Sequence, residues 1–220
     1  MKWLFNKTEN THPEFWTNYE SLFLEQKEGD ITASTYVILD TETTGFNYDK
    51  DRMLSIGAVK IINGYIDIST AFEIYIKQDY FDENTVQIHG ILKNDKFETV
   101  TEDEAIVLFL DYIKDSILVA HNAYFDIGMI NAAFKRHGLP ELKNKVLDTM
   151  HLFRATRTKS TVIPPKKTYS LEDLAEHYDI DLSDRHTASG DALITALAFL
   201  KSIHFLIKTK NYTLKELFKL

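Results

Sequence analysis

Two acidic residues, Asp40 and Glu42, follow the apolar run 36–39 and are separated by a single residue. Side chains alternate between faces along a β-strand, so both carboxylates should project from the same face near a strand end. Two carboxylates this close repel each other unless a cation lies between them. Oxygen ligands of this kind suit Mg²⁺ or Mn²⁺. The pair therefore indicates a divalent metal site, with a solvated strand end and a threonine-rich turn as the alternative.

A third carboxylate, Asp126, follows a second apolar run at 117–120 and the polar residues His121 and Asn122. The pattern predicts that the run is a buried strand and that Asp126 lies in the first turn of the next helix. Acidic residues are favoured at helix N-termini by the helix dipole. Asp126 is therefore either a further metal ligand or simply a residue that starts a helix.

His186 and Asp191 form a third candidate pair, five residues apart. In one continuous helix this spacing would place them about 140° apart around the axis. They can share a site only if His186 lies in the loop before a helix and Asp191 lies in its first turn. Thr187 or Ser189 as the N-cap residue would produce that arrangement.

The surrounding sequence predicts an α/β domain that can bring these residues together. Residues 53–62 and 65–76 read as two strands joined at Asn63-Gly64, a strong hairpin signal. Later segments alternate between strands and helices, which favours a mixed sheet with helices on its faces. We expect strands at 36–39, 117–120 and 146–147, and helices at 102–115, 124–137, from 149, at 170–178, 188–207 and 213–219.

Composition restricts the class of protein. The 220-residue chain contains no cysteine, which excludes disulfides and thiolate metal sites. Its net charge of −8 argues against a protein that coats nucleic acid through a large positive surface. No apolar run reaches the roughly 20 residues that a membrane-spanning helix needs. With no export signal at the N-terminus, a cytoplasmic location is expected.

Taken in order and at these intervals, the three motifs resemble those of the DnaQ-like, or DEDDh, 3′→5′ exonucleases. That family includes the epsilon proofreading subunit of bacterial DNA polymerase III. The resemblance covers about residues 35–201, and nearby segments such as Ile56-Gly57-Ala58 and His89-Gly90-Ile91 share it. The matching motifs are Asp40-Thr41-Glu42, then His121-Asn122-Ala123-Tyr124-Phe125-Asp126, then His186 with Asp191.

The resemblance implies a ribonuclease H-like fold with a five-stranded mixed sheet. It also implies two Mg²⁺ or Mn²⁺ ions held by the four carboxylates of Asp40, Glu42, Asp126 and Asp191, with His186 as general base. Such an enzyme would remove nucleoside monophosphates from single-stranded DNA 3′ ends, in proofreading or DNA repair. Trimming of RNA 3′ ends is the nearest alternative. A catalytically silent module that binds nucleic acid or a polymerase is another, although it would have no need of the complete set.

Several further residues are candidates for holding the substrate or the motifs. The resemblance places the Thr43-Thr44 backbone near the terminal 3′-hydroxyl and His89 beside the terminal base, where His89 could equally be a turn residue. Asn122 is expected to orient the second motif. Asp148 is expected to cap a helix rather than to act as a fifth ligand.

Positive charge is concentrated between residues 154 and 169, where no acidic residue occurs. Such a stretch in an acidic chain predicts contacts with the phosphate backbone of a single strand. A solvated loop is the alternative. The five basic residues are Arg154, Arg157, Lys159, Lys166 and Lys167.

Both ends of the chain extend beyond the region of resemblance. We expect an N-terminal helical extension at 1–33, an exonuclease domain at 34–204 and a C-terminal helical extension at 205–220. An amphipathic helix predicted at 12–27 could pack on the domain, or it could bind a partner or a second copy. A DNA polymerase subunit is one possible partner for these extensions.

Overall fold

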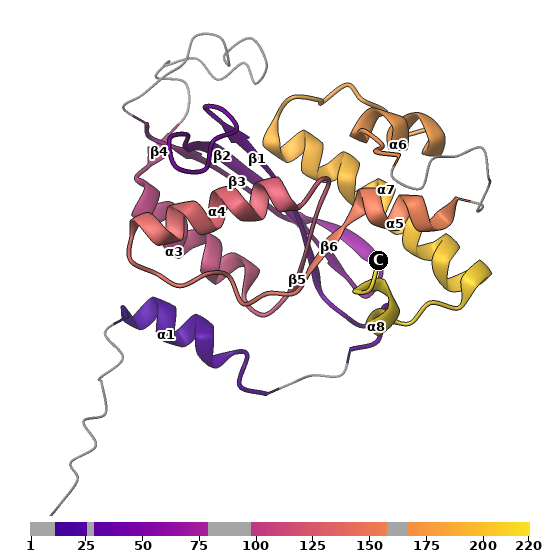
Figure 1. Ribbon diagram of the computed structural model, residues 1–220, viewed down its shortest axis with the longest axis horizontal. Helices are drawn as coiled ribbons and strands as arrows, with labels where there is room; N and C mark the ends of the chain where they lie inside the picture. Colours follow the sequence, from indigo (N-terminus) through magenta and orange to yellow (C-terminus); the bar gives the residue numbers. More distant parts are fainter. Residues whose placement is uncertain (1–11, 26–28, 79–97, 158–166) are drawn as a thin grey trace, which may run out of the picture.

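A six-stranded mixed sheet forms the centre of the protein in a computed structural model, which describes residues 12–25, 29–78, 98–157 and 167–220. The strand order is β4-β3-β2-β1-β5-β6 (Figure 1). β1 pairs antiparallel with β2, and β2 pairs antiparallel with β3, whereas β5 and β6 extend the sheet in parallel from β1. The strands are β1 Tyr36–Thr43, β2 Met53–Ile62, β3 Tyr65–Ile76, β4 Thr99–Val100, β5 Ile117–Ala120 and β6 Val146–Asp148.

Helices cover both faces of the sheet (Figure 1). One face packs against α1, α3 and α4, and the other packs against α5, α7 and α8, while α6 packs on α7. The helices are α1 Glu14–Ser21, α3 Glu102–Ile113, α4 Tyr124–Arg136, α5 Thr149–Thr156, α6 Leu171–Tyr178, α7 Ala188–Lys210 and α8 Leu214–Leu217.

The alternation of β1 assigns its residues to the two layers. Val37 and Leu39 belong to the core under α3 and α4, whereas Tyr36 and Ile38 belong to the core under α7. Continuing the alternation places Asp40 and Glu42 on the α7 face and Thr41 on the α4 face. The central strand therefore determines which helix each acidic residue of the first motif meets.

Gly57 allows α7 to approach the sheet closely. It pairs with Asp40 across β1 and β2, and a Cβ atom built on it would lie 2.2 Å from the backbone carbon of Ala188 and the backbone nitrogen of Ser189. No side chain fits in that gap, because ordinary carbon contacts need about 3.5–4.0 Å. The missing side chain at residue 57 therefore lets the first turn of α7 sit directly over the strand pair that carries Asp40.

Most predicted elements are confirmed, including the Asn63-Gly64 hairpin, in which Ile62 pairs with Tyr65. The sheet has six strands rather than the five expected, because β4 is only two residues long and gives no periodic signal in the sequence. The N-terminal helix covers Glu14–Ser21 instead of 12–27, since it begins after Pro13 and gives way to turns at Leu22.

Both terminal segments pack on the domain. Trp16 of α1 is fully buried beside Phe134, and the Tyr19 hydroxyl donates a 2.6 Å hydrogen bond to the side chain of Asn144. Leu217 of α8 is buried with the core under α7. α7 is long and apolar enough to cross a membrane by length and composition, but it packs on β1, β2 and α5 as a core helix.

We predict that Gly57→Ala destabilises the protein by about 1–3 kcal/mol, the usual cost of forcing an extra methyl group into a packed site. The clashing atoms are helix backbone, so α7 itself must move. Urea unfolding monitored by circular dichroism would measure the change. Gly128→Ala is the matched control, because the atoms nearest to its new methyl group belong to the side chain of Tyr48 and not to backbone. An equal free energy of unfolding in both variants would contradict this account of Gly57.

Candidate active site

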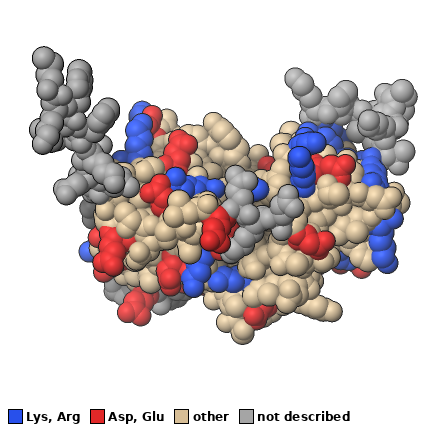
Figure 2. All heavy atoms as spheres, turned by 90° about the horizontal axis from the view of Figure 1, so that it is seen from below, with Lys and Arg blue, Asp and Glu red and all other residues tan. Residues whose placement is uncertain are grey.

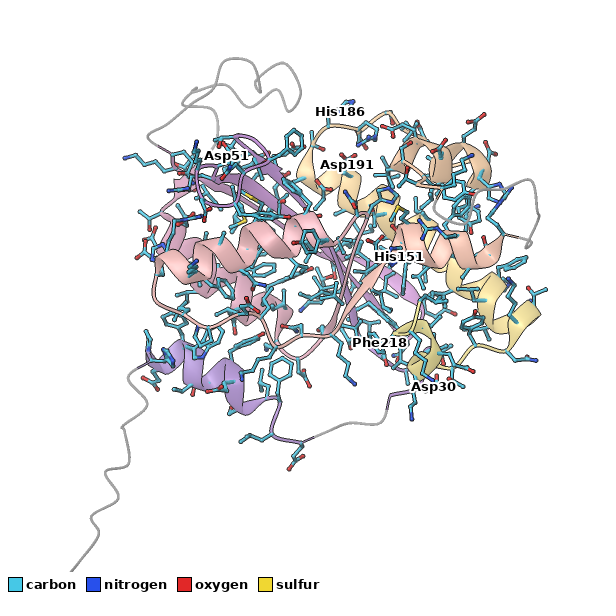
Figure 3. The ribbon with its side chains drawn as sticks, viewed as in Figure 1. Asp30, Asp51, His151, His186, Asp191 and Phe218 are labelled. Carbon is cyan, nitrogen blue, oxygen red and sulfur yellow. The ribbon has the colours of Figure 1, made fainter. Side chains whose placement is uncertain are left out.

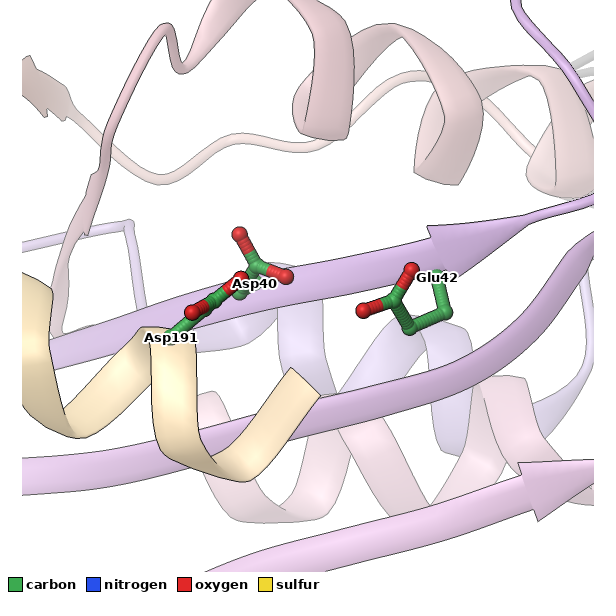
Figure 4. A group of neighbouring side chains, drawn as sticks. All are labelled: Asp40, Glu42 and Asp191. Carbon is green, nitrogen blue, oxygen red and sulfur yellow. The ribbon is translucent and has the colours of Figure 1, made fainter. Parts of the chain in front are cut away.

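Three carboxylates meet at the contact between β1 and the start of α7. One oxygen atom from each of Asp40, Glu42 and Asp191 can be chosen so that all three lie within 4.8 Å of one another. Figure 4 shows Asp40 and Asp191 side by side, with Glu42 further along the same strand. The structure thus brings together residues that are about 150 positions apart in the chain.

The start of α7 positions Asp191. Thr187 is the N-cap residue, and its hydroxyl accepts a 3.1 Å hydrogen bond from the backbone N–H of Gly190. Asp191 follows in the first turn and is buried. This is the arrangement that the spacing of the third motif requires, with His186 outside the helix and Asp191 inside it.

Asp126 reaches the same region from the opposite layer. It lies in the first turn of α4, and its Oδ1 accepts hydrogen bonds from the backbone N–H and the hydroxyl of Thr41, at 3.0 and 2.7 Å. These bonds fix Oδ1 of the carboxylate. Asp126 is outside the group of three defined by the 4.8 Å distances, although its charge acts on Asp40.

The buried acids hold their protons more tightly than in water. Burial raises the pKa of Asp40 well above its usual range, and the charges of Asp126, Asp191 and Glu42 raise it further. Burial, then the charge of Asp191, raises the pKa of Glu42 to about 7. Burial also raises the pKa of Asp126 to about 7, against the lowering effect of its hydrogen bonds from Thr41. Such shifts are typical of carboxylates gathered at a functional site.

The donor set fits a divalent cation. Asp191 Oδ1 is buried and has no hydrogen-bond partner among the described residues. An unpartnered buried oxygen is costly, and a bound cation would satisfy it while relieving the repulsion between the carboxylates. Carboxylate oxygens are the ligands that Mg²⁺ and Mn²⁺ favour.

His186 is exposed in the loop directly before α7, and its backbone is in the left-handed region with φ of 67°. Figure 3 shows it at the end of α7 that carries Asp191. Its ring makes no hydrogen bond to the described residues, so it can turn toward a bound molecule. Gly190 permits this tight loop, since a Cβ there would lie 1.9 Å from the carbonyl oxygen of Asp184.

Sequence reasoning missed one cation of the site, Arg185. Its guanidinium donates to Asp191 Oδ2 and to Glu172 at the start of α6. Burial lowers the pKa of Arg185, but the hydrogen bonds to these two carboxylates outweigh burial and raise it. Its charge also opposes the raised pKa values of Asp40 and Glu42. Its place beside His186 was the only available signal, because Glu172 is remote in sequence.

A cleft of about 520 Å³ opens beside the carboxylates. Part of its lining comes from the turn after β1 and from the loop after β5. Residues 168–172 also line it, and a 3.0 Å hydrogen bond between His121 Nε2 and the carbonyl of Tyr169 holds them to the loop after β5. Burial lowers the pKa of His121, so the neutral ring is favoured. The lining includes Asp40, Phe46, His121, Asn122, Tyr169, Glu172, Arg185 and Asp191.

The turn after β1 is organised by Asp51. The hydroxyl of Thr44, which is buried, donates to Asp51 Oδ1 at 2.9 Å, and Asp51 Oδ2 accepts from the backbone N–H of Asn47 at 2.8 Å. The hydroxyl of Thr43 donates to the carbonyl of Gly45 at 2.9 Å. Both threonine side chains therefore serve the turn, and the backbone N–H of Thr44 donates to the carbonyl of Arg52 at 2.9 Å.

Asp148 caps α5, as predicted. Its carboxylate accepts from the backbone N–H groups of Met150, Asn122 and Ala123, at 2.8, 3.2 and 3.0 Å. The same side chain thus fixes the loop before α4, where Asn122 has a left-handed backbone. Asp148 is fully engaged in positioning the second motif.

The predicted basic residues are divided between internal contacts and the cleft. Arg154 donates to the carbonyl of Lys167 at 2.9 and 3.2 Å, and Arg157 lies over the ring of Phe153 and contacts His177. The Lys167 ammonium lies 4.8 Å from the centre of the Tyr169 ring, which lines the cleft. His89, Lys159 and Lys166 lie outside the described residues. The roles of all six as substrate contacts stay predictions.

The sheet and its helices form a ribonuclease H-like exonuclease fold. A family model described as "Exonuclease" (RNase T) matches residues 37–199, and the chain belongs to this RNase T/DnaQ-like exonuclease family. It is thus a DnaQ-like 3′→5′ exonuclease domain.

Curated relatives include the PolC-type DNA polymerase III of Pediococcus pentosaceus, 34% identical over 166 residues, which are 75% of this chain and 11% of that protein. The PolC-type polymerase of Streptococcus pyogenes serotype M1 is 34% identical over 174 residues, 78% of this chain and 11% of the relative.

Solved structures show the same fold. E. coli exonuclease I in complex with a dT13 oligonucleotide has a TM-score of 0.64 at 20% identity, covering 81% of this chain and 42% of that one. Exonuclease X in complex with 5′-overhanging duplex DNA has a TM-score of 0.61 at 23% identity, covering 84% and 98%. This chain spans only about a tenth of the length of the curated relatives it matches.

We predict that the metal-chelated protein loses stability as the pH rises from about 4.5 to about 7. The pKa of Glu42 is raised from 4.5 to about 7 in the folded protein, so folding favours the protonated carboxyl. This stabilisation is complete below the unfolded pKa and disappears as the pH passes the folded value. Thermal unfolding in EDTA across this range would measure it.

Glu42→Gln should flatten that pH profile, and added Mg²⁺ should oppose the loss in the parent protein. Glu141→Gln, which alters an exposed carboxyl, controls for the change in net charge. Parallel profiles for the parent and Glu42→Gln would show that the carboxyl of Glu42 does not titrate in this way.

Proposed function

We propose that this protein is a metal-dependent 3′→5′ exonuclease that hydrolyses phosphodiester bonds at single-stranded DNA 3′ ends and releases nucleoside monophosphates. The observation that carries the proposal is the group of Asp40, Glu42 and Asp191 within 4.8 Å, with Asp126 beside it. Oxygen ligands gathered around an unsatisfied buried carboxylate oxygen are what Mg²⁺ or Mn²⁺ would need. A catalytically silent binding module would have no use for this costly arrangement.

The four carboxylates would hold two Mg²⁺ or Mn²⁺ ions. When bound, such ions activate water and stabilise the charge on the leaving oxygen. The charges of Asp126, Asp191 and Glu42 all act on Asp40, which supports a role for Asp40 as the central metal ligand. Glu42 and Asp191 would complete the side nearer the attacking water, and Asp126 would use the oxygen that Thr41 does not occupy.

His186 would act as general base. As the water oxygen attacks phosphorus, the ring takes the water proton, and the bond to the 3′-oxygen of the penultimate nucleotide breaks. Histidine is the side chain most often used to accept a proton in this way. Its exposed loop position beside Asp191 supports the role, because the ring is not committed to another contact among the described residues.

The substrate would be held by the cleft and its rims. Phe46 is 81% exposed and lines the cleft with Asp40, and its ring centre lies 5.5 Å from that of Phe125 in a tilted arrangement, so it offers an apolar surface to the terminal base. The Thr43-Thr44 backbone would approach the terminal 3′-hydroxyl. Lys167 would contact the strand backbone on the opposite rim, together with the remaining predicted basic residues and His89.

The acidic character of the chain favours a local rather than a general contact with nucleic acid. On the face shown in Figure 2, basic and acidic side chains of the described residues are interspersed over α1 and its surroundings. Binding would therefore depend on the cleft. The net charge of −8 also predicts that nucleic acid binds only weakly outside the cleft, because the acidic surface there repels phosphates.

The relatives named as DNA polymerases support a proposed role in DNA proofreading or repair. In this role the protein would act in the cytoplasm, and a DNA polymerase subunit would be its partner. The extensions at 1–33 and 205–220 flank the proposed exonuclease domain at 34–204. Since Trp16 and Leu217 are buried in the domain, a partner would meet the outer faces of α1 and α8.

Asp40→Ala and Asp191→Asn should each abolish nuclease activity while the protein still folds. Each change removes a metal ligand and with it the stabilisation of the transition state. The measurement is digestion of labelled single-stranded DNA and RNA, with Mg²⁺ or EDTA, alongside circular dichroism. DNA should be degraded faster than RNA. Near-normal turnover by a well-folded Asp40→Ala protein would exclude this residue as a ligand, and faster digestion of RNA would reassign the substrate.

His186→Ala should lower the single-turnover rate by roughly 10²–10⁴, the usual contribution of a general base. Metal affinity measured by calorimetry should change little, and raising the pH should partly restore the rate because hydroxide becomes available. His204→Ala is a matched control, since His204 is an exposed histidine on α7, well beyond the first turn that carries Asp191. A collapse of metal affinity in His186→Ala would identify the residue as a ligand instead.

A further inference from the structure

Tyr124 is a large aromatic side chain that the fold leaves almost uncovered. It is the first residue of α4, two positions before Asp126, and it is 80% exposed. Its hydroxyl makes no hydrogen bond to the described residues. The core of the domain therefore does not account for an aromatic residue here, although its neighbours on either side, Ala123 and Phe125, both pack inward.

A continuous row of rings joins Tyr124 to the cleft. The ring centres of Phe46 and Phe125 are 5.5 Å apart, those of Phe125 and Tyr48 6.2 Å, and those of Tyr48 and Tyr124 6.1 Å. Phe46 lines the cleft beside Asp40. We call these four rings the aromatic wall. The wall starts at the carboxylates and ends at Tyr124, so a strand leaving the cleft along it would meet Tyr124 after Phe46.

The support beneath Tyr124 is rigid. The ring of Tyr48 packs on the surface of α4 at Gly128, where a Cβ would lie 2.6 Å from it. The Tyr48 hydroxyl donates to the backbone carbonyl of Tyr124 at 3.4 Å. Asp148 holds the backbone N–H groups of the two residues before Tyr124. A ring presented on a fixed backbone loses little conformational freedom when a ligand stacks on it.

The chemistry of this end of the wall suits a nucleobase. A base has a flat, uncharged face, and stacking on an aromatic side chain tolerates any base. Tyr124 presents both an apolar ring and a hydroxyl on a surface continuous with the cleft.

We propose that Tyr124, supported by Tyr48, stacks on the penultimate base of the single strand. The inference rests on the proposed nuclease function and specifies its substrate further, as a 3′ end with at least two unpaired nucleotides. The terminal base would lie against Phe46 and the next base against Tyr124. Stacking on the aromatic wall would thus keep these bases apart from a complementary strand, whatever the base sequence.

The test uses short single-stranded DNA carrying one 2-aminopurine, whose fluorescence falls when the base stacks. The probe is placed at the terminal, the penultimate or the fifth position from the 3′ end. Binding is followed in Ca²⁺ with full-length protein carrying Asp40→Ala, so that no cleavage occurs. Quenching should be present at the terminal and penultimate positions. Adding Tyr124→Leu should remove it at the penultimate position only and weaken binding by roughly 5- to 100-fold.

Three variants provide the controls. Tyr124→Phe keeps the ring and should retain quenching and affinity. Phe46→Leu should remove quenching at the terminal position instead. Tyr65→Leu replaces a tyrosine that is 78% exposed on the β2–β3 hairpin and should have no effect. Tyr124 is exposed, so its replacement leaves the core intact, which circular dichroism would check.

The outcomes separate this inference from the function on which it depends. Unchanged penultimate quenching and affinity in Tyr124→Leu, in a parent that binds and degrades DNA, would overturn the role of Tyr124 alone. A parent that neither binds nor degrades single strands would overturn both. If Tyr124→Leu weakened binding without any change in quenching, the residue would contact the sugar or backbone, and the stacking proposal would be wrong.

Discussion

The contact between Gly57 on β2 and the first turn of α7 sets the geometry on which the site depends. Asp40 and Gly57 are paired across two strands, and α7 rests where a side chain on residue 57 would have been. Asp191 is carried by that turn, so the separation between Asp191 and Asp40 follows from how closely helix and sheet approach. A single absent methyl group thus determines whether the carboxylates of β1 and α7 can share a cation.

Packing of the helices on the sheet brings together carboxylates that repel one another. Burial and mutual repulsion raise the pKa values of Asp40, Glu42 and Asp126, which means that ionisation of the site opposes folding. Arg185, held between Asp191 and Glu172, offsets part of this cost with one positive charge. Stability given up at a functional site is a common consequence of preorganising charged groups for catalysis.

The sequence was sufficient to predict what periodicity and local geometry encode. Alternation along the first strand placed Asp40 and Glu42 on one face, and the N-cap rule placed His186 outside and Asp191 inside the first turn of α7. Contacts between remote residues were beyond such rules. Three features depend on tertiary packing: the Arg185–Glu172 ion pair, the hydrogen bond from His121 to the carbonyl of Tyr169, and the two-residue strand β4.

Counting charges had a similar limit. The excess of basic residues at 154–169 predicted phosphate contacts, but Arg154 binds a backbone carbonyl and Arg157 lies against Phe153 and His177. The sequence does not reveal whether a basic side chain already donates its hydrogen bonds to other residues of the same fold. Among the described members of this stretch, Lys167 lies beside a residue of the cleft and stays a clear candidate for a backbone contact.

The proposed chemistry and the proposed substrate contacts rest on different kinds of structure in this protein. The carboxylates come from the central strand and the first turns of α4 and α7, which are anchored in the two cores. The exposed aromatic residues Phe46 and Tyr124 come from a turn and a helix start that Asp51 and Asp148 hold in place. Asp148 anchors both sets, because its carboxylate fixes the loop before α4, and the first turn of α4 carries Asp126 as well as Tyr124. The side chain of Tyr124 is exposed, however, so a substitution there would change the proposed stacking surface without removing a group from either core.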